Sequence, residues 1–504
     1  MNDCAIVLLG ATGDLAKRKI FPGLYTLFEK NKLGNSIIVG AALSDVTAEQ
    51  LLENTKKFVR PKDEIQWQEF GKRVSYVTID FSHEGDFNTL ATFVSAQEKK
   101  AKITGNRIVY CATAPYFYCR ITQGLAKSGL IKRMPTAKID PSIRSLSEHS
   151  GRANKNPFVV SDAAGIVSNH IFQRIIYEKP FGHDLESAQE INACIAEHFE
   201  EHQIFRIDHY LTKELVGNIA LVRFTNIVFE PLWNNRYIDQ VQVIFDEELC
   251  LDGRGAFYDK YGALADVMQN HMMQLVALIG MEPPEKLTGD YIRTERAKVL
   301  QKVKVVDALL GQYDGYHQEN GVAPDSKTET FAQVYLRIEN PRWAGVPFYL
   351  KAGKCLDKKE TTIYIKFKHV DCLLSKACPS ETNSLMIEIS PNPLFALTLN
   401  AKVPGKSDEV TPVQMKFETG AFGNQSPEAY ETLFEEILKG EQSVSVRFDE
   451  IEYAWKIIDA IRALKPALYT YERGSKGPQE SVAQFEKKHG MRWVNLSKAG
   501  GTKK

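Results

Sequence analysis

The chain has 504 residues, enough for two or three domains. Apolar residues make up 43% and charged residues 25%, values typical of soluble globular proteins, which excludes extended disorder. Lysine plus arginine and aspartate plus glutamate each number 63, so the balanced charge argues against nucleic-acid and membrane-surface partners. No apolar run reaches about 18 residues, so we expect no transmembrane helix, and the first residues lack the basic segment of a signal peptide.

Eight cysteines are scattered along the chain without a C-x-x-C pair. In a chain of this length, that distribution favours reduced thiols and a cytoplasmic protein over a disulfide framework or a zinc site. We therefore expect no metal. The cysteines are Cys4, Cys111, Cys119, Cys194, Cys250, Cys355, Cys372 and Cys378.

The first half of the chain alternates segments typical of strands with segments typical of helices. The apolar run from Ala5 to Leu9 has the length of a strand buried on both faces. Apolar residues then recur at helical spacing from Ile20 to Phe28, although Pro22 should kink or delay that helix. Further strands are predicted at 36–40, 74–79, 107–112 and 174–178, and a helix at 188–199. This alternation predicts a Rossmann-like α/β domain with a parallel sheet.

The second half has a different pattern, in which several predicted strands follow one another without helices between them. Helices are predicted at 208–224 and 264–279, and strands at 238–245, 330–338, 361–367, 385–390 and 410–417. Such an order predicts an α+β domain with a large, mainly antiparallel sheet.

We place the dinucleotide-binding domain at 1–206 and a substrate-binding and oligomerisation domain at 207–496. Within the first domain, the polar segment 132–170 is expected to be an insertion or a flexible loop. The small, basic segment 497–504 is expected to be a disordered tail.

A turn suited to nucleotide binding follows the first predicted strand. Its sequence is Gly10-Ala11-Thr12-Gly13-Asp14-Leu15-Ala16, a G-x-x-G-x-x-A variant of the dinucleotide-binding motif. Gly10 permits a tight turn, Gly13 lets the backbone approach a pyrophosphate, and Ala16 allows close packing of helix on strand. The alternative is an ordinary strand–turn–helix connection. No arginine lies in 37–44 and the nearest acid is Asp45, so these residues leave NAD and NADP both open.

The densest polar cluster of the chain runs from Arg206 to Glu214. If Asp208 caps a helix here, then His209, Tyr210 and Lys213 project from its first turn. An imidazole, a phenol and an ammonium group near a positive helix terminus suit a phosphate dianion. A solvated helix start with an ordinary cap is the alternative.

His271 lies in an apolar helical pattern, on the same stripe as Val267 and Leu275. It is either a core histidine or a general base whose imidazole is oriented by a carboxylate, for which Asp208 is a candidate. Lys351 and Lys354 follow as candidate sugar or phosphate ligands, although most lysines are solvated surface residues.

Five motifs in a fixed order resemble those of the glucose-6-phosphate dehydrogenase family, over a match from Ala5 to about Pro478. They are Gly10-Ala-Thr-Gly-Asp-Leu-Ala-Lys-Arg-Lys19, Glu178-Lys-Pro-Phe-Gly182, Arg206-Ile-Asp-His-Tyr-Leu211, Asp266-Val-Met-Gln-Asn-His271 and Phe348-Tyr-Leu-Lys-Ala-Gly-Lys354. The resemblance implies oxidation of D-glucose 6-phosphate at C1 to 6-phosphoglucono-δ-lactone, with hydride transfer to NADP or NAD. This reaction is the first step of the oxidative pentose phosphate pathway.

The resemblance also implies roles for individual residues. His271 would remove the C1 hydroxyl proton and Asp208 would stabilise the imidazolium. The 6-phosphate would be bound by His209, Tyr210 and Lys213. Sugar contacts are implied for Lys179, Glu247, Asp266 and Lys354, and a position near substrate and cofactor for Lys19. Cofactor binding is implied for Gly10, Ala11, Thr12, Gly13, Asp14, Leu15 and Lys179, and a homodimer or homotetramer as the assembly.

Several positions depart from the family pattern. Leu43 stands where many NADP-using members have arginine, so we expect weaker discrimination between NADP and NAD. Ser390 replaces a common glutamine, and Glu388 and Lys351 replace arginines of a second, structural NADP site, which is not expected here. A dehydrogenase of another hexose 6-phosphate, or a non-catalytic sensor of nucleotide and sugar phosphate, remain the alternatives.

Overall fold

The computed structural model describes residues 3–103, 105–135, 171–370, 382–406, 409–418 and 427–494. The chain forms two compact units. The first unit consists of Met1–Phe181, Gln189–Ile207 and Leu433–Ser445, and the second of Gly182–Ala188, Asp208–Thr432 and Val446–Lys504. Of the expected insertion at 132–170, only 132–135 lie within the described residues, and the expected tail at 497–504 lies outside them.

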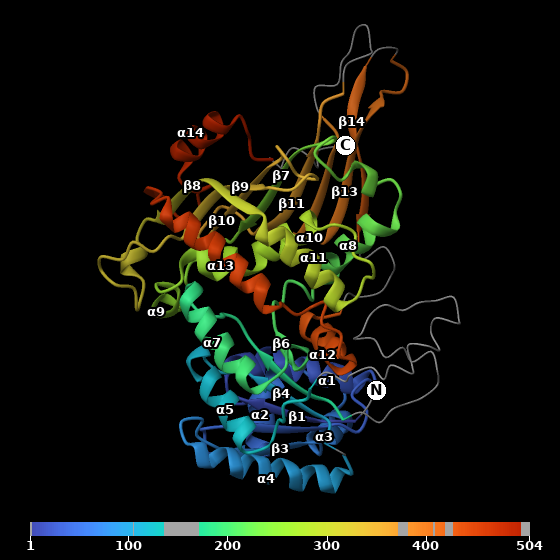
Figure 1. The fold of residues 1–504 in the computed structure, drawn as a ribbon, viewed down its shortest axis with the longest axis vertical. Helices are drawn as coiled ribbons and strands as arrows, with labels where there is room; N and C mark the ends of the chain where they lie inside the picture. Colours follow the sequence, from blue (N-terminus) through green and yellow to red (C-terminus); the bar gives the residue numbers. More distant parts are fainter. Residues whose placement is uncertain are drawn as a thin grey trace. The chain divides into compact units, whose positions relative to one another are not determined.

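The described part of the first unit contains a six-stranded parallel sheet with the strand order β3-β2-β1-β4-β5-β6 (Figure 1). Its strands are β1 (Ala5–Leu9), β2 (Ile37–Ala42), β3 (Val74–Thr78), β4 (Arg107–Cys111), β5 (Gln173–Tyr177) and β6 (Ile204–Arg206). Every residue of β1 is buried, because helices cover both faces of a parallel sheet. The order is that of a doubly wound dinucleotide-binding fold, which confirms the predicted class.

Helices connect these strands. They are α1 (Phe21–Glu29), α2 (Ala48–Val59), α3 (Glu64–Gly71), α4 (Glu84–Ala101), α5 (Tyr118–Lys127) and α7 (Leu185–His198). A π-helical turn, Ala16–Ile20, precedes α1, and Pro22 lies in the first turn of α1. The residues before Pro22 are already helical, and the N–H of Phe21 donates to the carbonyl oxygen of Ala16 in the wider π pattern. The regular α-helix begins only at Phe21, which fits the expected delay.

A segment from the far end of the chain completes the first unit. The end of α12 (Ala429–Lys439) and the residues up to Ser445 belong to this unit. The guanidinium group of Arg174, on β5, donates to the carbonyl oxygens of Ile437 (2.5 Å) and Leu438 (3.1 Å). It thereby satisfies carbonyl groups at the end of α12, for which the helix itself supplies no N–H donor.

The described part of the second unit contains a nine-stranded sheet, ordered β14-β13-β12-β11-β7-β10-β9-β8-β15. Its strands are β7 (Ile238–Asp246), β8 (Val303–Tyr313), β9 (Phe331–Ile338), β10 (Pro347–Gly353), β11 (Glu360–Phe367), β12 (Ser384–Ser390), β13 (Leu394–Lys402), β14 (Val410–Glu418) and β15 (Leu468–Tyr471). Two of its pairings are parallel, β7 with β10 and β8 with β15, and the others are antiparallel. The predicted mainly antiparallel sheet is confirmed.

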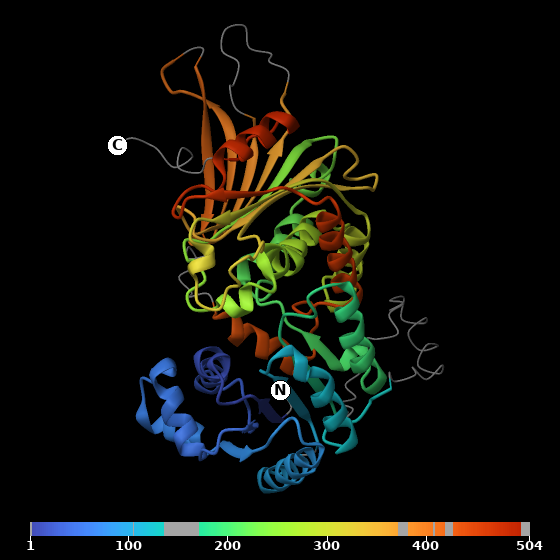
Figure 2. The same cartoon turned by 90° about the vertical axis from the view of Figure 1, so that its left-hand side faces the viewer.

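Helices lie on both sides of this sheet (Figures 1 and 2). They are α8 (Glu214–Thr225), α9 (Gly255–Tyr258), α10 (Met273–Gly280), α11 (Gly289–Gln301), α13 (Phe448–Ala463) and α14 (Gln479–His489). Helices α10, α11 and α13 lie along one face, and α14 lies on the other (Figures 1 and 2). A π-helical segment, Leu264–Met272, runs directly into α10 on the first of these faces.

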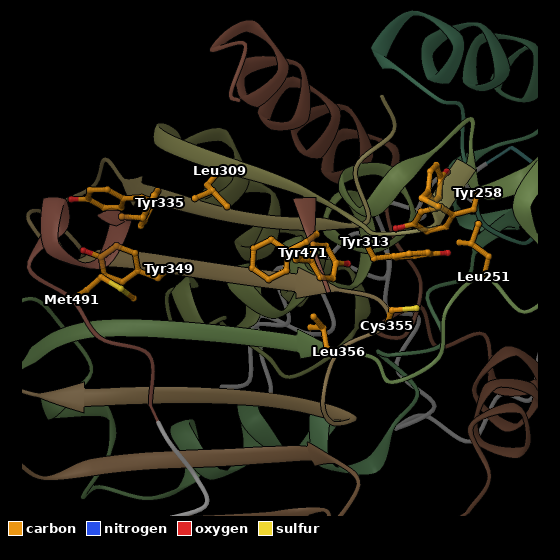
Figure 3. Close-up of a cluster of buried hydrophobic side chains, with 13 residues drawn as sticks. Leu251, Tyr258, Leu309, Tyr313, Tyr335, Tyr349, Cys355, Leu356, Tyr471 and Met491 are labelled. Carbon is orange, nitrogen blue, oxygen red and sulfur yellow. The ribbon is translucent and has the colours of Figure 1, made fainter. Parts of the chain in front are cut away.

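Tyrosines dominate the core between the sheet and α14 (Figure 3). Tyr313, Tyr335, Tyr349 and Tyr471 come from four strands, and Phe485 of α14 packs against the same cluster. Large aromatic side chains bury much apolar area while their hydroxyl groups still find polar partners. The hydroxyl of Tyr471, for example, donates to the carbonyl oxygen of Lys354 at 2.7 Å.

The predicted helix at 208–224 is wrong at its start. Helix α8 begins at Glu214 with Lys213 as its N-cap, and residues 208–213 form turns. Asp208 Oδ1 accepts the backbone N–H of Tyr210 at 2.9 Å. A carboxylate that bonds the backbone two residues on stabilises a turn in competition with a helix, which explains the later start.

The expectation that the cysteines are reduced is wrong for four of them. The structure joins Cys119 to Cys194, with Cα atoms 5.8 Å apart, and Cys250 to Cys355, with Cα atoms 4.6 Å apart. The partners are 75 and 105 residues apart in sequence, so no short motif reveals the pairs. Cys4 and Cys111 are buried free thiols. Across the described residues, no helix combines the length and apolarity required to cross a membrane.

The turn after β1 requires glycine at position 10. Gly10 has φ +83°, and a Cβ there would lie 2.4 Å from the carbonyl oxygen of Ala112. Gly10→Ala should therefore lower the free energy of unfolding by about 1–3 kcal/mol, measured by urea denaturation. Gly85→Ala is the matched control, because Gly85 is exposed in α4 with nothing within 4 Å of an added Cβ. An unchanged midpoint for Gly10→Ala would contradict the steric argument.

Candidate functional site

A histidine and an aspartate meet in the interior of the second unit. The ring Nδ1 of His271 lies 2.5 Å from Oδ1 of Asp208, and each residue is 2% exposed. The two residues are 63 apart in sequence, so the turn after β6 and the π-helical segment bring them together. A buried imidazole bonded to a carboxylate is the arrangement expected of an oriented general base.

The π-helical segment sets the position of the His271 side chain. Within it, the amide group of Asn270 donates to the carbonyl oxygens of Ala265 (3.2 Å) and Asp266 (3.0 Å). The side-chain oxygen of Asn270 accepts the backbone N–H of His271 at 2.7 Å. These bonds satisfy polar groups that the wider turn leaves without regular partners. Single π-turns inside α-helices occur frequently at functional sites.

Three further aromatic rings surround the imidazole of His271. The centroid of Tyr210 lies 4.4 Å from it, that of His209 4.6 Å, and that of Phe245 6.2 Å. His209 and Tyr210 come from the turn before α8, and Phe245 comes from β7. The predicted phosphate cluster and the predicted base are thus parts of one site.

The carboxylate of Asp208 remains ionised despite its burial. Burial raises its pKa, but the charge and hydrogen bond of His271 and the charge of His209 outweigh that effect and hold the pKa well below its ordinary value. Oδ2 of Asp208 is buried without a hydrogen-bond partner among the described residues. An ionised carboxylate against Nδ1 stabilises the protonated imidazole that would follow proton uptake.

A lysine forms the cationic side of the site. Nζ of Lys213 lies 3.7 Å from the centroid of the Tyr210 ring. Burial, and then the like charge of Lys359, lower the pKa of Lys213 to about 8. Our sequence analysis did not single out Lys359, which lies five residues after Lys354 without a motif of its own. The hydroxyl groups of Tyr210 and Thr361 are 3.4 Å apart.

An ion pair lies at the ends of β7 and β10. Nζ of Lys354 is 2.6 Å from Oε2 of Glu247. The same ammonium group lies 5.2 Å from the ring centroid of Tyr258, whose pKa the charge of Asp266 helps to raise after the larger effect of burial. Lys354 is almost fully buried, so its ammonium group is held in one place. The predicted sugar contacts Glu247, Asp266 and Lys354 therefore have common neighbours.

Lys351, a candidate ligand from the sequence, lies on the other face of the sheet. It is opposite Ile244 of β7 in register, whereas the next residue of β7, Phe245, faces His271. Successive residues of a strand point to opposite faces. Nζ of Lys351 pairs with Oδ2 of Asp246 at 2.8 Å. The interpretation of Lys351 as a substrate ligand is therefore wrong.

The predicted nucleotide turn lies in the first unit, between β1 and the π-helical turn before α1. The N–H of Gly10 donates to the carbonyl oxygen of Ala41 at 2.8 Å, and the N–H of Gly13 to that of Gly10 at 2.9 Å. The remaining turn residues are Ala11, Thr12, Asp14 and Leu15. The predicted ligand Lys19 is exposed on the π-helical turn, and Lys179 follows β5 in the same unit.

Hydroxyl groups lie at the end of β2, where the adenosine part of a nucleotide would bind, and residues 37–44 include no lysine or arginine. Oγ1 of Thr12 lies 3.1 Å from Oγ of Ser44. Leu43 is 68% exposed, and Asp45 follows it. A 2′-phosphate placed here would have no arginine partner from 37–44.

A metal could be held by residues of the same site. Asp208, His209 and His271 each offer one ligand atom, and these atoms lie within 4.8 Å of one another. Two imidazoles and a carboxylate suit a divalent transition metal. The hydrogen bond between Asp208 and His271 already occupies Oδ1 of the carboxylate and Nδ1 of the ring, an arrangement that needs no metal.

Comparisons with known proteins identify a family. The profile "Glucose-6-phosphate dehydrogenase, NAD binding domain" matches residues 7–140 and 152–218, and "Glucose-6-phosphate dehydrogenase, C-terminal domain" matches 220–494. Glucose-6-phosphate 1-dehydrogenase of Bacillus subtilis (strain 168) is 36% identical over 97% of this chain and 98% of its own. A cytoplasmic enzyme of that name from Arabidopsis thaliana is 35% identical over 97% and 93%, and a chloroplastic one from Spinacia oleracea is 34% identical over 98% and 84%.

A solved structure is similar over the whole chain. It is described as glucose-6-phosphate dehydrogenase in complex with its substrate glucose-6-phosphate. Its TM-score is 0.84 at 32% identity, and the match covers 98% of this chain and 99% of that one. The similarity therefore extends through both units.

The lowered pKa of Lys213 predicts that anion binding depends on pH. Because the ammonium form predominates only below about pH 8, affinity for a dianion should fall above that pH, by roughly tenfold per unit. Sulfate is a suitable probe, since it stays a dianion throughout. Its dissociation constant can be measured by calorimetry from about pH 7 to about pH 9.5.

Two variants control this measurement. Lys213→Gln should bind sulfate weakly with little change across the range. Lys359→Gln removes the like charge and should move the onset of the loss to higher pH. A wild-type affinity that stays constant above pH 8 would contradict the assignment of Lys213 to the anion.

Proposed function

The chain belongs to the glucose-6-phosphate dehydrogenase family, and we propose that it oxidises D-glucose 6-phosphate at C1, with hydride transfer to NAD(P)+, to 6-phosphoglucono-δ-lactone. The observation that carries this proposal is the buried hydrogen bond between His271 and Asp208, surrounded by His209, Tyr210 and Lys213. The oxidation of a phosphorylated alcohol requires a proton acceptor, and positively charged residues that bind the phosphate must lie next to it.

His271 acts as the general base in this proposal. With Nδ1 engaged by Asp208, Nε2 takes the proton of the C1 hydroxyl group as the C1–H bonding pair leaves as hydride. Asp208 holds the ring in position and stabilises the resulting imidazolium, because its carboxylate stays ionised. The carbonyl bond of the lactone forms between C1 and the deprotonated oxygen.

The remaining residues position the substrate. His209, Tyr210 and Lys213 bind the 6-phosphate, and Lys359 adds positive charge, which suits a dianion. Glu247, Asp266 and Lys354 contact the sugar hydroxyl groups. The ion pair between Glu247 and Lys354 holds these two side chains next to each other. Within the first unit, we propose that Lys179 contacts the cofactor and that Lys19 lies near it.

The turn from Gly10 to Leu15 fits a dinucleotide. The positive φ of Gly10 and the carbonyl oxygen of Ala112 beside it leave no room for a side chain, which keeps the turn tight, and we assign the close approach to a pyrophosphate to Gly13. When bound, the nicotinamide supplies the acceptor for the hydride. The chain has the NAD-binding domain of its family, and we place this domain at 1–206 and the substrate-binding and oligomerisation domain at 207–496.

NADP is the cofactor that we propose, with weak discrimination against NAD. Thr12 and Ser44 offer hydroxyl groups to a ribose or a 2′-phosphate, but Leu43 contributes neither charge nor hydrogen bond. Charge-assisted bonds are about twice as strong as neutral ones, so their absence leaves little to separate the two cofactors.

A homodimer or homotetramer built through the large sheet is the proposed assembly, in the cytoplasm and without nucleic-acid or membrane partners. The exposed side chains of the edge strand β14 support the proposal that a second copy of the chain covers this part of the sheet. One face of β13 and β14 exposes a row of large apolar side chains, which monomeric proteins rarely leave uncovered. They are Leu399, Val413, Met415 and Phe417, with Met415 63% exposed.

His271→Asn tests the proposed base. We expect kcat with glucose 6-phosphate to fall by about a hundredfold or more, because the amide cannot accept the C1 proton. The measurement is the absorbance of reduced nicotinamide with NADP and with NAD. His83→Asn, at an exposed histidine before α4, should keep the wild-type rate. A folded His271→Asn enzyme with undiminished kcat would refute the role, and an inactive wild type with both cofactors would refute the function.

Leu43→Arg tests the cofactor proposal. An arginine at this exposed position can pair with a 2′-phosphate, so the ratio of kcat/KM for NADP to that for NAD should rise by about tenfold. Leu43→Gln, a polar change without charge, should leave the ratio near the wild-type value. A wild-type enzyme that already strongly prefers NADP would show that other residues provide the discrimination.

A further inference from the structure

Glu329, just before β9, contacts the start of the π-helical segment that carries His271. Its carbonyl oxygen accepts the N–H of Ala263 at 3.0 Å, and its side-chain Oε1 accepts the N–H of Leu264 at 2.9 Å. The first N–H groups of a helix have no acceptor within the helix. Glu329 therefore caps this segment from outside; burial raises the pKa of its carboxyl group, and the hydrogen bond from Leu264 opposes that effect.

The residue at position 262 leaves room for this cap. Gly262 has φ +65°, and a Cβ there would lie 2.4 Å from Oε1 of Glu329. The carboxylate thus packs directly against the backbone of the turn that leads into the segment. Because its two acceptors bind consecutive N–H groups, Glu329 determines both where the segment begins and how it is rotated about its axis.

The next residue, Thr330, holds the sugar-binding lysine. Its carbonyl oxygen accepts the N–H of Lys354 at 2.9 Å. Its hydroxyl oxygen lies 2.8 Å from the hydroxyl of Tyr471, which donates to the carbonyl oxygen of Lys354 at 2.7 Å. Both backbone polar groups of Lys354 are therefore fixed, and the ring of Tyr471 is itself held in the tyrosine-rich core (Figure 3).

From these contacts we propose that Glu329 is a positioning residue: it fixes the segment carrying Asp266 and His271 in register with Lys354, which the adjacent Thr330 holds. The proposal rests on the proposed function of His271 and Lys354. Two consecutive residues at one end of a sheet strand thus connect the proton acceptor to a sugar ligand. A shift of about 1 Å in such a register can reduce turnover by about a hundredfold.

Two substitutions at position 329 separate the lost hydrogen bond from the lost charge. Glu329→Ala removes the acceptor, and kcat with glucose 6-phosphate should fall by about ten- to a hundredfold. Glu329→Gln keeps an oxygen that can accept the N–H of Leu264, so its kcat should stay within about threefold of wild type. The KM for the nucleotide should be unchanged in both, because the nucleotide turn belongs to the first unit.

Two more variants test the second contact and the background. Tyr471→Phe removes the donor to Lys354 and should raise the KM for glucose 6-phosphate several-fold with kcat near wild type. Lys327→Ala, at an exposed position two residues from Glu329, should behave as wild type. A merely structural role would lower the yield of folded enzyme without producing this division between kcat and KM.

A folded Glu329→Ala enzyme with kcat within twofold of wild type would overturn the proposal, as would a Glu329→Gln enzyme as slow as Glu329→Ala. If Glu329→Ala does not fold, Gly262→Ala provides the test, because it keeps the carboxylate but displaces it. A normal kcat in Gly262→Ala would then overturn the proposal. A wild type without activity refutes the proposed function itself, whereas an active wild type with an unaffected Glu329→Ala refutes only this inference.

Discussion

The second unit is organised around a buried negative charge. Asp208 is 2% exposed and ionised, and leaving such a carboxylate unpaired in a protein interior costs about 3–5 kcal/mol. His271 and the backbone N–H of Tyr210 both bond its Oδ1. One carboxylate thus specifies the turn before α8, the orientation of the imidazole and the protonation chemistry of the pair, so these three features depend on one another.

Both local hydrogen bonds and contacts from residues distant in sequence hold Asp208 and His271 in place. The turn of Asp208 is closed by its own side chain, and Asn270 satisfies the wide π-turn beside His271. The start of the π-helical segment, in contrast, is capped by Glu329, which is 65 residues from the N–H that it accepts. The position of His271 therefore depends on a residue outside its own helix, which lies just before strand β9 of the large sheet.

Periodicity was enough to predict several of the buried strands, but it missed β8, β10 and β13 as well as the turns and the remote partners. The apolar run Ala5–Leu9 coincides with β1, because both faces of a parallel strand are buried. The start of α8 was misplaced because Asp208 bonds its own turn. The error at Lys351 arose because the sequence analysis did not predict β10, in whose register Lys351 lies opposite Ile244, on the face of the sheet away from His271. The disulfide partners and Glu329 leave no local signal, because only the tertiary fold brings them to their targets.

The return of residues 433–445 to the first unit has a consequence for biosynthesis. A ribosome makes the six parallel strands early, but the carbonyl groups that Arg174 binds are synthesised only after residues 208–432 have followed. The nascent amino-terminal half must therefore persist without its last structural element while most of the other half emerges. Domains usually fold in order of their synthesis, whereas here the unit that starts first is completed only after residues 208–432 of the second unit have been made.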